Sequence, residues 1–361
     1  TGMFVIPGLW DMHIHLHFTN DTARFHSTSE VMLPLFLVNG VTGVRDLGSN
    51  LEASIALRDS VAAHQVLGPR MLVSGPMIDG PTSQYAAAIK VATPDEARAA
   101  VRTLKEGRVD LIKTQTLIPR DAYFAMAEEA TRLGIPFEGH VPRAITAVEA
   151  VTAGQRSFEH MIGISDTSTA LITALAEHRV WQCPTVINSV GTPRDFIEDP
   201  GLPFWLRASV ESWRRAAVTR FEATDSAKRA FSERATRRLG LIKKLHDAKV
   251  PLLAGTDAPQ GYDLVPGTSL HRELQLLVRA GLTPLEALQA ATLNPAAYFG
   301  KTAEWGTVAA GKTADLVVLA RNPLAGIANT RSVVAVVADG RYFSPRELER
   351  LRLRIMELAA K

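Results

Sequence analysis

The chain opens with an apolar segment that carries two histidines, Trp10-Asp11-Met12-His13-Ile14-His15-Leu16. Successive side chains of a strand point to opposite faces, so Asp11, His13 and His15 share one face of this predicted strand. Seven further short apolar runs are predicted to be strands: Val41–Arg45, Met71–Ser74, Val109–Lys113, Ile135–His140, Ser157–His160, Val180–Pro184 and Val250–Asp257.

Helical patterns lie between most of these strands. Examples are Pro94–Glu106, Arg120–Leu133 and Ala144–Ala153. Alternation of strand and helix indicates parallel βαβ units. Eight such units within about 250 residues match a (β/α)8 TIM barrel in number and size. The sequence therefore predicts an α/β chain with this barrel over residues 7–300.

The pattern changes after the barrel. Thr283-Pro284-Leu285-Glu286 predicts a capped helix start, and Asp315–Leu319 and Val333–Asp339 read as strands. We expect residues 1–6 and 301–343 to form a small, possibly incomplete β-sandwich domain from the two chain termini. In an incomplete domain, unpaired strand edges around Asp315–Leu319 would need cover. Residues 344–361 are predicted to form a charged surface helix.

One connection, between Cys183 and Val250, is far longer than a normal link between a strand and a helix. Its second part, residues 204–249, is compatible with a long basic helix. One interpretation is an extended barrel helix with a solvated basic face. The other is that residues 185–250 form a lid over the barrel mouth, since long loops there often gate sites.

Composition excludes several classes of protein. Hydrophobic residues make up 46% of the 361 positions, which is typical of a globular chain. With 40 basic and 37 acidic residues, the net charge is only +3, which gives no support for nucleic-acid binding. A single cysteine, Cys183, rules out an intramolecular disulfide framework. No apolar run approaches the roughly 18 residues of a membrane span.

These observations set our expectations for partners and location. We expect a small-molecule substrate, no nucleic acid, no membrane and a homo-oligomer. The first residues show no signal-peptide pattern, which favours a cytoplasmic location. Export stays open, because position 1 is not a methionine and residues upstream could be missing.

Ionisable groups stand at the ends of five predicted strands. Two imidazoles two residues apart, as in His13 and His15, can bind one metal ion together. Four other strands end in a metal-compatible or ionisable side chain: Lys113, His140, His160 and Asp257. Barrel active sites lie at this end of the strands, so a chance coincidence is much less probable for the set than for any single member.

The set of motifs resembles the amidohydrolase superfamily over essentially the whole chain. The matching segments are Val5-Ile6-Pro7-Gly8-Leu9-Trp10-Asp11-Met12-His13-Ile14-His15-Leu16, Lys113, Gly139-His140-Val141-Pro142-Arg143, Phe158-Glu159-His160, Ala254-Gly255-Thr256-Asp257-Ala258 and Gly306-Thr307-Val308-Ala309-Ala310-Gly311-Lys312-Thr313-Ala314-Asp315-Leu316-Val317-Val318-Leu319. The strand-four lysine together with Leu282-Thr283-Pro284-Leu285-Glu286-Ala287 is similar to the imidazolonepropionase- and prolidase-like group.

The resemblance implies a binuclear metal centre. Its ligands would be His13, His15 and Asp257 for the first ion, and His140 and His160 for the second. Lys113 would be carboxylated by CO2 and would bridge both ions. Neutral imidazoles suit zinc, which is the metal we favour, and a carbamate supplies anionic oxygens.

The implied activity is hydrolysis of an amide-type C–N bond, in an N-acyl amino acid, a dipeptide-like compound or a cyclic amide. Two dications would lower the pKa of a bridging water, and Asp257 would carry its proton to the leaving nitrogen. A lactonase or a phosphotriesterase is an alternative, because the same hydroxide attacks esters and phosphorus centres. A non-catalytic metal-binding scaffold is the alternative of a different class.

Three further residues are candidate substrate contacts. Arg143 lies three residues beyond His140, where it could hold a substrate carboxylate or cap the following helix. His17 continues the alternation of the first strand, and Tyr262 follows Asp257 as a possible pocket wall.

Overall fold

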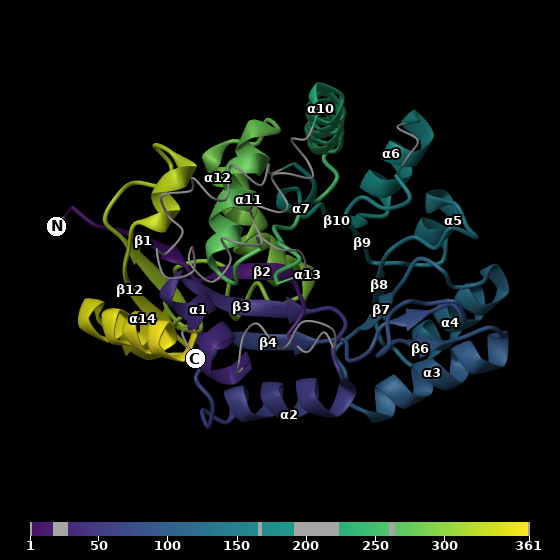
Figure 1. Cartoon of the computed structure of the whole chain (residues 1–361), viewed down its shortest axis with the longest axis horizontal. Coiled ribbons are helices and arrows are strands. Elements are labelled where there is room, and N and C mark those ends of the chain that lie inside the picture. The colour runs from purple at the N-terminus through teal and green to yellow at the C-terminus, as the bar shows by residue number, and fades with distance from the viewer. Residues whose placement is uncertain (1, 17–27, 165–167, 191–223, 260–263, 360–361) are drawn as a thin grey trace.

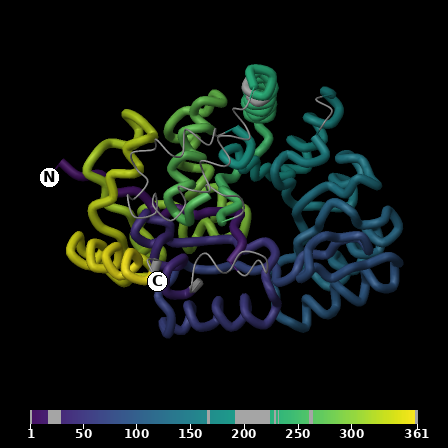
Figure 2. The backbone as a smooth tube through the Cα atoms, viewed as in Figure 1, coloured from purple at the N-terminus to yellow at the C-terminus, as the bar shows by residue number. Residues whose placement is uncertain are grey.

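The computed structural model describes residues 2–16, 28–164, 168–190, 224–259 and 264–359. In this part of the chain, helices surround a set of short parallel strands (Figure 1). The first and last described segments lie at the same end of the molecule (Figure 2). The chain therefore has the expected α/β class.

The parallel strands form two hydrogen-bonded groups. One has the order β2-β3-β4 and the other has the order β10-β9-β8-β7-β5-β6. Their bounds are β2 (Leu9–Ile14), β3 (Val41–Asp46), β4 (Arg70–Val73), β5 (Ile78–Asp79), β6 (Ile89–Lys90), β7 (Ile112–Thr114), β8 (Phe137–Gly139), β9 (Ser157–Glu159) and β10 (Trp181–Cys183). Seven of the eight predicted strands are present, and the two-residue strands β5 and β6 are additions.

The eighth predicted strand, Val250–Asp257, is irregular. The pairing here consists of isolated parallel bridges, Gln182 with Leu252 inside the run and Ile14 with Ala258 directly after it. The run contains a proline, which has no N–H to donate to a regular ladder. It nevertheless connects β10 on one side with β2 on the other.

Helices follow most strands. They are α1 (Leu33–Val38), α2 (Leu51–Ala62), α3 (Pro94–Glu106), α4 (Arg120–Arg132), α5 (Ala147–Thr152), α6 (Thr169–Glu177), α7 (Ile187–Val190), α10 (Asp225–Asp247), α11 (Thr268–Arg279), α12 (Pro284–Ala290), α13 (Leu293–Tyr298) and α14 (Pro345–Ala359). Among the described residues, none of these helices combines the length and apolarity needed to cross a bilayer.

The helix starts follow their sequence signals. Thr283 caps α12 as predicted: its side chain accepts from the backbone of Glu286, and the Glu286 carboxylate accepts from the Thr283 N–H.

The long basic helix is confirmed only over α10. Residues 191–223, which include the first part of the predicted segment 204–249 and most of the loop before it, lie outside the described residues.

A separate antiparallel sheet has the order β1-β11-β12-β13. Its strands are β1 (Phe4–Pro7), β11 (Leu316–Leu319), β12 (Val333–Ala338) and β13 (Arg341–Phe343). The strand at Asp315–Leu319 has no unpaired edge of the kind that an incomplete domain would leave. The N-terminal strand pairs with β11 on one side and β12 pairs with it on the other, so β11 lies inside the sheet.

The charged C-terminal helix α14 packs one apolar stripe inward. Leu348 and Ile355, seven residues apart, are buried with Val336 and Phe343 of the small sheet and with Leu35 of α1. Its arginines and glutamates occupy the other faces, as an amphipathic surface helix requires.

A charged cluster lies inside the main fold. Arg45, at the end of β3, is fully buried and donates to the carboxylates of Glu138 and Glu159. The two Arg45–Glu bonds therefore join β3 to β8 and β9. The guanidinium also donates to the Met12 carbonyl at 2.6 Å and lies over the Tyr298 ring. Burial alone would lower the pKa of Arg45, but the two carboxylates outweigh this and raise it.

We predict that Arg45→Met strongly destabilises the fold. Methionine keeps most of the side-chain length but leaves Glu138 and Glu159 buried without their cation. Breaking a buried ion pair in this way typically costs about 3–5 kcal/mol of unfolding free energy. Urea denaturation followed by circular dichroism measures the change.

The matched control is Arg98→Met, which removes a surface ion pair with Glu128. Exposed pairs contribute about 1 kcal/mol or less, so the control should unfold almost as the wild type does. Equal stability losses in the two variants would contradict a structural role for the buried guanidinium.

Candidate metal centre

Four histidines meet where the parallel strands end. His13 lies in β2 and His15 follows it, while His140 and His160 come directly after β8 and β9. The ring centroid of His13 lies 5.2 Å from that of His15 and 4.4 Å from that of His160. The centroids of the His140 and His160 rings are 5.0 Å apart. The structure therefore brings together four predicted site residues from three strands.

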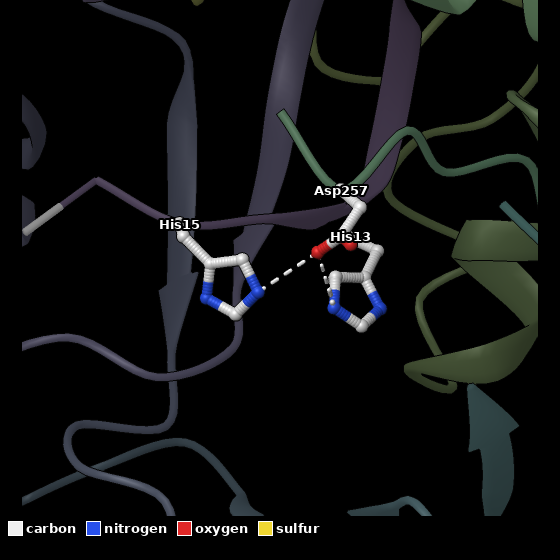
Figure 3. A group of neighbouring side chains, drawn as sticks. All are labelled: His13, His15 and Asp257. Carbon is white, nitrogen blue, oxygen red and sulfur yellow. Dashed lines mark ion pairs between the residues drawn. The ribbon is translucent and has the colours of Figure 1, made fainter. Parts of the chain in front are cut away.

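The Asp257 carboxylate joins this cluster (Figure 3). One carboxylate oxygen lies 3.0 Å from Nε2 of His15 and 3.4 Å from Nε2 of His13. The other oxygen accepts a hydrogen bond of 2.6 Å from the amide of Asn188. Burial alone would raise the pKa of Asp257, but the nearby His160, His15 and Lys113 outweigh it and lower the pKa. Asp257 is therefore placed to act as an anion.

Two of these residues have an unusual backbone. Asp257 has φ 69° and His160 has φ 58°, in the left-handed region that residues with a Cβ rarely adopt. Such conformations cost of the order of 1 kcal/mol or more each. They are found where the surrounding contacts hold the backbone in place. Both side chains are turned toward the cluster by these conformations.

Lys113 of β7 lies beside the histidines and is 1% exposed. Its Nζ atom has no hydrogen-bond partner among the described residues. Burial lowers the pKa of Lys113 to about 8, so its amine is partly neutral near physiological pH. An unpaired buried lysine is costly, which makes this side chain an exception that needs an explanation.

Three histidines are oriented by partners behind them. Nδ1 of His13 contacts the Glu159 carboxylate at 2.6 Å. Nδ1 of His140 contacts Oγ1 of Thr116 at 2.9 Å, and Nδ1 of His160 contacts Oγ1 of Thr185 at 2.6 Å. Engagement of Nδ1 leaves Nε2 as the ring nitrogen available to the centre of the cluster. Nε2 of His13 is buried and has no hydrogen-bond partner among the described residues.

Burial keeps these rings neutral. It lowers the pKa of His13 and His140 well below the ordinary value, and that of His160 to about 3, with the Lys113 charge contributing in each case. A neutral imidazole with Nδ1 engaged and Nε2 free is the form that ligates a metal ion. The donor set therefore fits a metal centre.

A second group deeper in the fold does not fit one. His13, Glu159 and Cys183 lie close enough to share an ion. However, Glu159 already pairs with the Arg45 guanidinium, whose charge would repel a cation. Burial raises the pKa of the Cys183 thiol, so it stays protonated and a poor ligand. The thiol is a buried structural residue.

Most of the cluster lines a cavity of about 360 Å³. His15, Lys113, His140, His160 and Asp257 all line it, as do Tyr85, Asn188, Thr185, Arg234 and Arg238. This volume is sufficient for a small molecule.

The candidate substrate contacts have different outcomes. Arg143 is exposed and is not among the residues that line the cavity. His17 and Tyr262 lie outside the described residues. Of the predicted lid segment, α7 and α10 are described, and each contributes residues to the cavity wall.

Sequence reasoning missed the partners of the histidines. Thr116, Thr185 and Asn188 lie in the first few residues after β7 and β10. A search for hydroxyl and amide side chains just beyond each strand end would have included them. Glu159 had a clearer signal, because it directly precedes His160 on a strand.

Comparison with known proteins identifies the family of this chain. The amidohydrolase family model matches residues 4–342. The ochratoxinase of Aspergillus niger is 26% identical over 400 aligned positions, which cover 94% of this chain and 75% of that protein. A solved bottromycin amidohydrolase superposes with a TM-score of 0.78 and 27% identity, covering 99% of this chain and 81% of the other.

A Xaa-Pro dipeptidase structure superposes with a TM-score of 0.72 at 20% identity, covering 95% of this chain and 87% of the other, a likeness of fold alone. The family match extends over nearly the whole chain, including the strands that carry the four histidines, Lys113 and Asp257. The chain therefore belongs to the amidohydrolase family, as its motifs predicted, and is a hydrolase that acts on carbon–nitrogen bonds.

Proposed function

We propose that this enzyme uses two divalent metal ions, with zinc favoured, to hydrolyse an amide-type C–N bond in an N-acyl amino acid, a dipeptide-like compound or a cyclic amide. One observation carries the proposal. Three histidines, of which His13 and His140 are buried and His160 is half-buried, are held through Nδ1, which leaves their Nε2 atoms available beside Asp257 and Lys113. The relatives named ochratoxinase and bottromycin amidohydrolase support a hydrolytic role for this arrangement.

The proposed scaffold is a closed (β/α)8 barrel with a small terminal β domain. The irregular run that follows α10 supports closure. The N–H of Leu253 donates to the Gln182 carbonyl at 2.8 Å, and the N–H of Met12 donates to the Ala254 carbonyl at 2.9 Å. Backbone hydrogen bonds thus connect β10 to β2 through this run.

The ligands are assigned to two sets. His13, His15 and Asp257 would hold the first ion, and His140 and His160 the second, with Lys113 between them. When bound, such ions lower the pKa of a water molecule and polarise a carbonyl group. A pair of adjacent dications also needs anionic ligands, which neutral imidazoles do not supply.

Lys113 supports the proposed bridge. A free ammonium group would repel both ions. The neutral amine can instead add CO2, forming an N–C bond and releasing a proton, to give a carbamate whose two oxygens share one negative charge. The buried Nζ atom without a hydrogen-bond partner and a pKa near 8 favour this modification.

Asp257 is the proposed proton carrier. Its carboxylate faces the cavity, and the Asn188 amide fixes the oxygen that does not face the histidines. An anionic carboxylate held in this way can accept a proton from water and return it to a leaving nitrogen. Asn188 would keep the carboxylate in one orientation through both transfers.

A substrate screen tests the proposed activity. Zinc-loaded protein is assayed with N-acyl amino acids, dipeptides, cyclic amides, lactones and phosphotriesters. We expect turnover of at least one amide class. Turnover of only lactones or only phosphotriesters would favour the ester- or phosphorus-cleaving alternative. Metal-loaded protein that turns over none of the panel would argue against the proposed substrate classes.

The Glu159 contact generates a prediction about metal affinity. Glu159→Gln removes the negative charge behind Nδ1 of His13 and makes this ring a weaker ligand. Loss of such an outer contact typically weakens metal binding about 10- to 100-fold. Competition with a chelator, followed by elemental analysis, measures the affinity.

Glu138→Gln is the matched control. Glu138 is equally buried and also bonds to Arg45, but no hydrogen bond joins it to His13. Its metal affinity should stay close to that of the wild type. If both variants lose affinity equally, the effect arises from the Arg45 cluster and not from the Glu159–His13 contact.

The proposed role of Asp257 predicts a selective loss of rate. Asp257→Asn keeps the shape and one carbonyl oxygen, but an amide cannot accept and return a proton at neutral pH. The other ligands should retain at least one metal ion. Loss of a positioned acid–base group costs about 10²–10⁴ in rate, so kcat should fall by at least this factor on the best substrate of the screen.

Substrate affinity should change far less than kcat, and metal content is measured on the same sample. A variant that holds metal and keeps more than about a tenth of the wild-type kcat would show that another group carries the proton.

A further inference from the structure

Two arginines of α10 line the cavity above the histidine cluster. Arg234 and Arg238 lie four residues apart and therefore on the same face of the helix. Arg238 is half-buried, and its guanidinium donates to the backbone carbonyl of His160. This bond fixes Arg238 beside one of the cluster histidines.

The charge pattern of α10 separates these two arginines from two other cations of the helix, Arg237 and Lys243. Arg237 lies 3.8 Å from the carboxylate of Glu233, and Lys243 lies 2.6 Å from that of Asp247, each pair with the i,i+4 spacing. Neither Arg234 nor Arg238 has a carboxylate partner in the described ranges. Like charges at this spacing repel each other, so the pair lowers helix stability slightly unless an anion joins it.

The walls of the cavity do not supply that anion. Asp257 is the one acidic residue among the described residues that line it. One of its oxygens lies 3.0–3.4 Å from Nε2 of His15 and His13, and the other accepts from Asn188, so the carboxylate is directed toward these residues. The carbamate proposed at Lys113 would be bound to the two ions, so an anion for the two arginines must come from outside the described part of the cavity.

We infer that Arg234 and Arg238 form a clamp for a carboxylate on the substrate, remote from the bond that is cleaved. This inference rests on the proposed function, whose N-acyl amino acid and dipeptide-like substrates carry such a group. A guanidinium binds a planar carboxylate through two parallel N–H bonds, which fixes orientation as well as position. The anchor on His160 places the clamp next to the proposed centre.

The clamp replaces Arg143 in this role. Arg143 was the sequence-based candidate for a carboxylate contact, but its side chain is exposed and does not line the cavity. Its position three residues after His140 made it a reasonable prediction. The two arginines belong to α10, a helix far along the chain. No local motif predicts that this helix lies beside the cavity.

The test compares binding of matched acids and amides to metal-loaded protein. Calorimetry measures the affinity for acetylglycine, acetyl-leucine and acetyl-phenylalanine, and for the three corresponding carboxamides. We expect the wild type to bind at least one acid roughly 10- to 100-fold more tightly than its carboxamide, the range of charge-assisted hydrogen bonds. Because no turnover is required, the outcome is independent of the substrate screen.

Arg238→Gln and Arg234→Gln should each reduce this acid-to-amide preference, and the double variant should abolish it. Arg238→Lys keeps the charge but not the fork, and should retain part of the preference. A purely structural role would weaken acid and amide equally and leave their ratio unchanged. Metal content and circular dichroism confirm that each variant is folded.

Two control variants complete the design. Arg237→Gln changes the adjacent residue on the same helix, which pairs with Glu233, and Arg143→Gln removes the earlier candidate. Both should keep the wild-type ratio. The inference is overturned if the wild type shows no acid preference, if it binds none of the acids, or if the double variant keeps the ratio. It is also overturned if a control variant loses the ratio as fully as the clamp variants do.

Discussion

The carboxylate of Glu159 links the stability of the fold to the orientation of the site. One of its oxygens accepts from Arg45 and the other contacts Nδ1 of His13, with all three side chains fully buried. Without the guanidinium, two carboxylates would be left uncompensated between the strands. Without the carboxylate, the His13 ring would lose the partner that directs Nε2 toward the cluster. The orientation of His13 therefore depends on a buried ion-pair cluster that also stabilises the core.

Strand geometry explains why the cluster forms at all. Parallel strands end at one edge, so a residue at the end of each strand reaches a common point without help from long loops. At the two positions where strand geometry is not sufficient, His160 and Asp257, the backbone adopts the left-handed region. Their local strain is offset by the surrounding packing and hydrogen bonds, a pattern common at functional sites.

The sequence predicted what depends on local periodicity. Seven strands, the capping box of α12 and the strand-end histidines follow from alternation, spacing and capping chemistry. The sequence did not reveal Arg45 as the centre of a buried cluster, because its carboxylates are about 90 and 110 residues away. The Thr116, Thr185 and Asn188 contacts were missed for the same reason. One side of β11 pairs with β1, near the start of the chain. A local pattern in the sequence cannot show which strand β1 pairs with.

The cations around the cavity differ in how much they need an anion. Lys113 is fully buried, so its charge is unfavourable at all times and only removal or conversion of that charge resolves it. Arg234 is exposed and Arg238 half-buried, so water stabilises both until a ligand displaces it. Their attraction for an anion consequently grows as the cavity is filled and dried. The carbamate proposed at Lys113 and the clamp inferred on α10 would thus be two ways to compensate the same excess of positive charge.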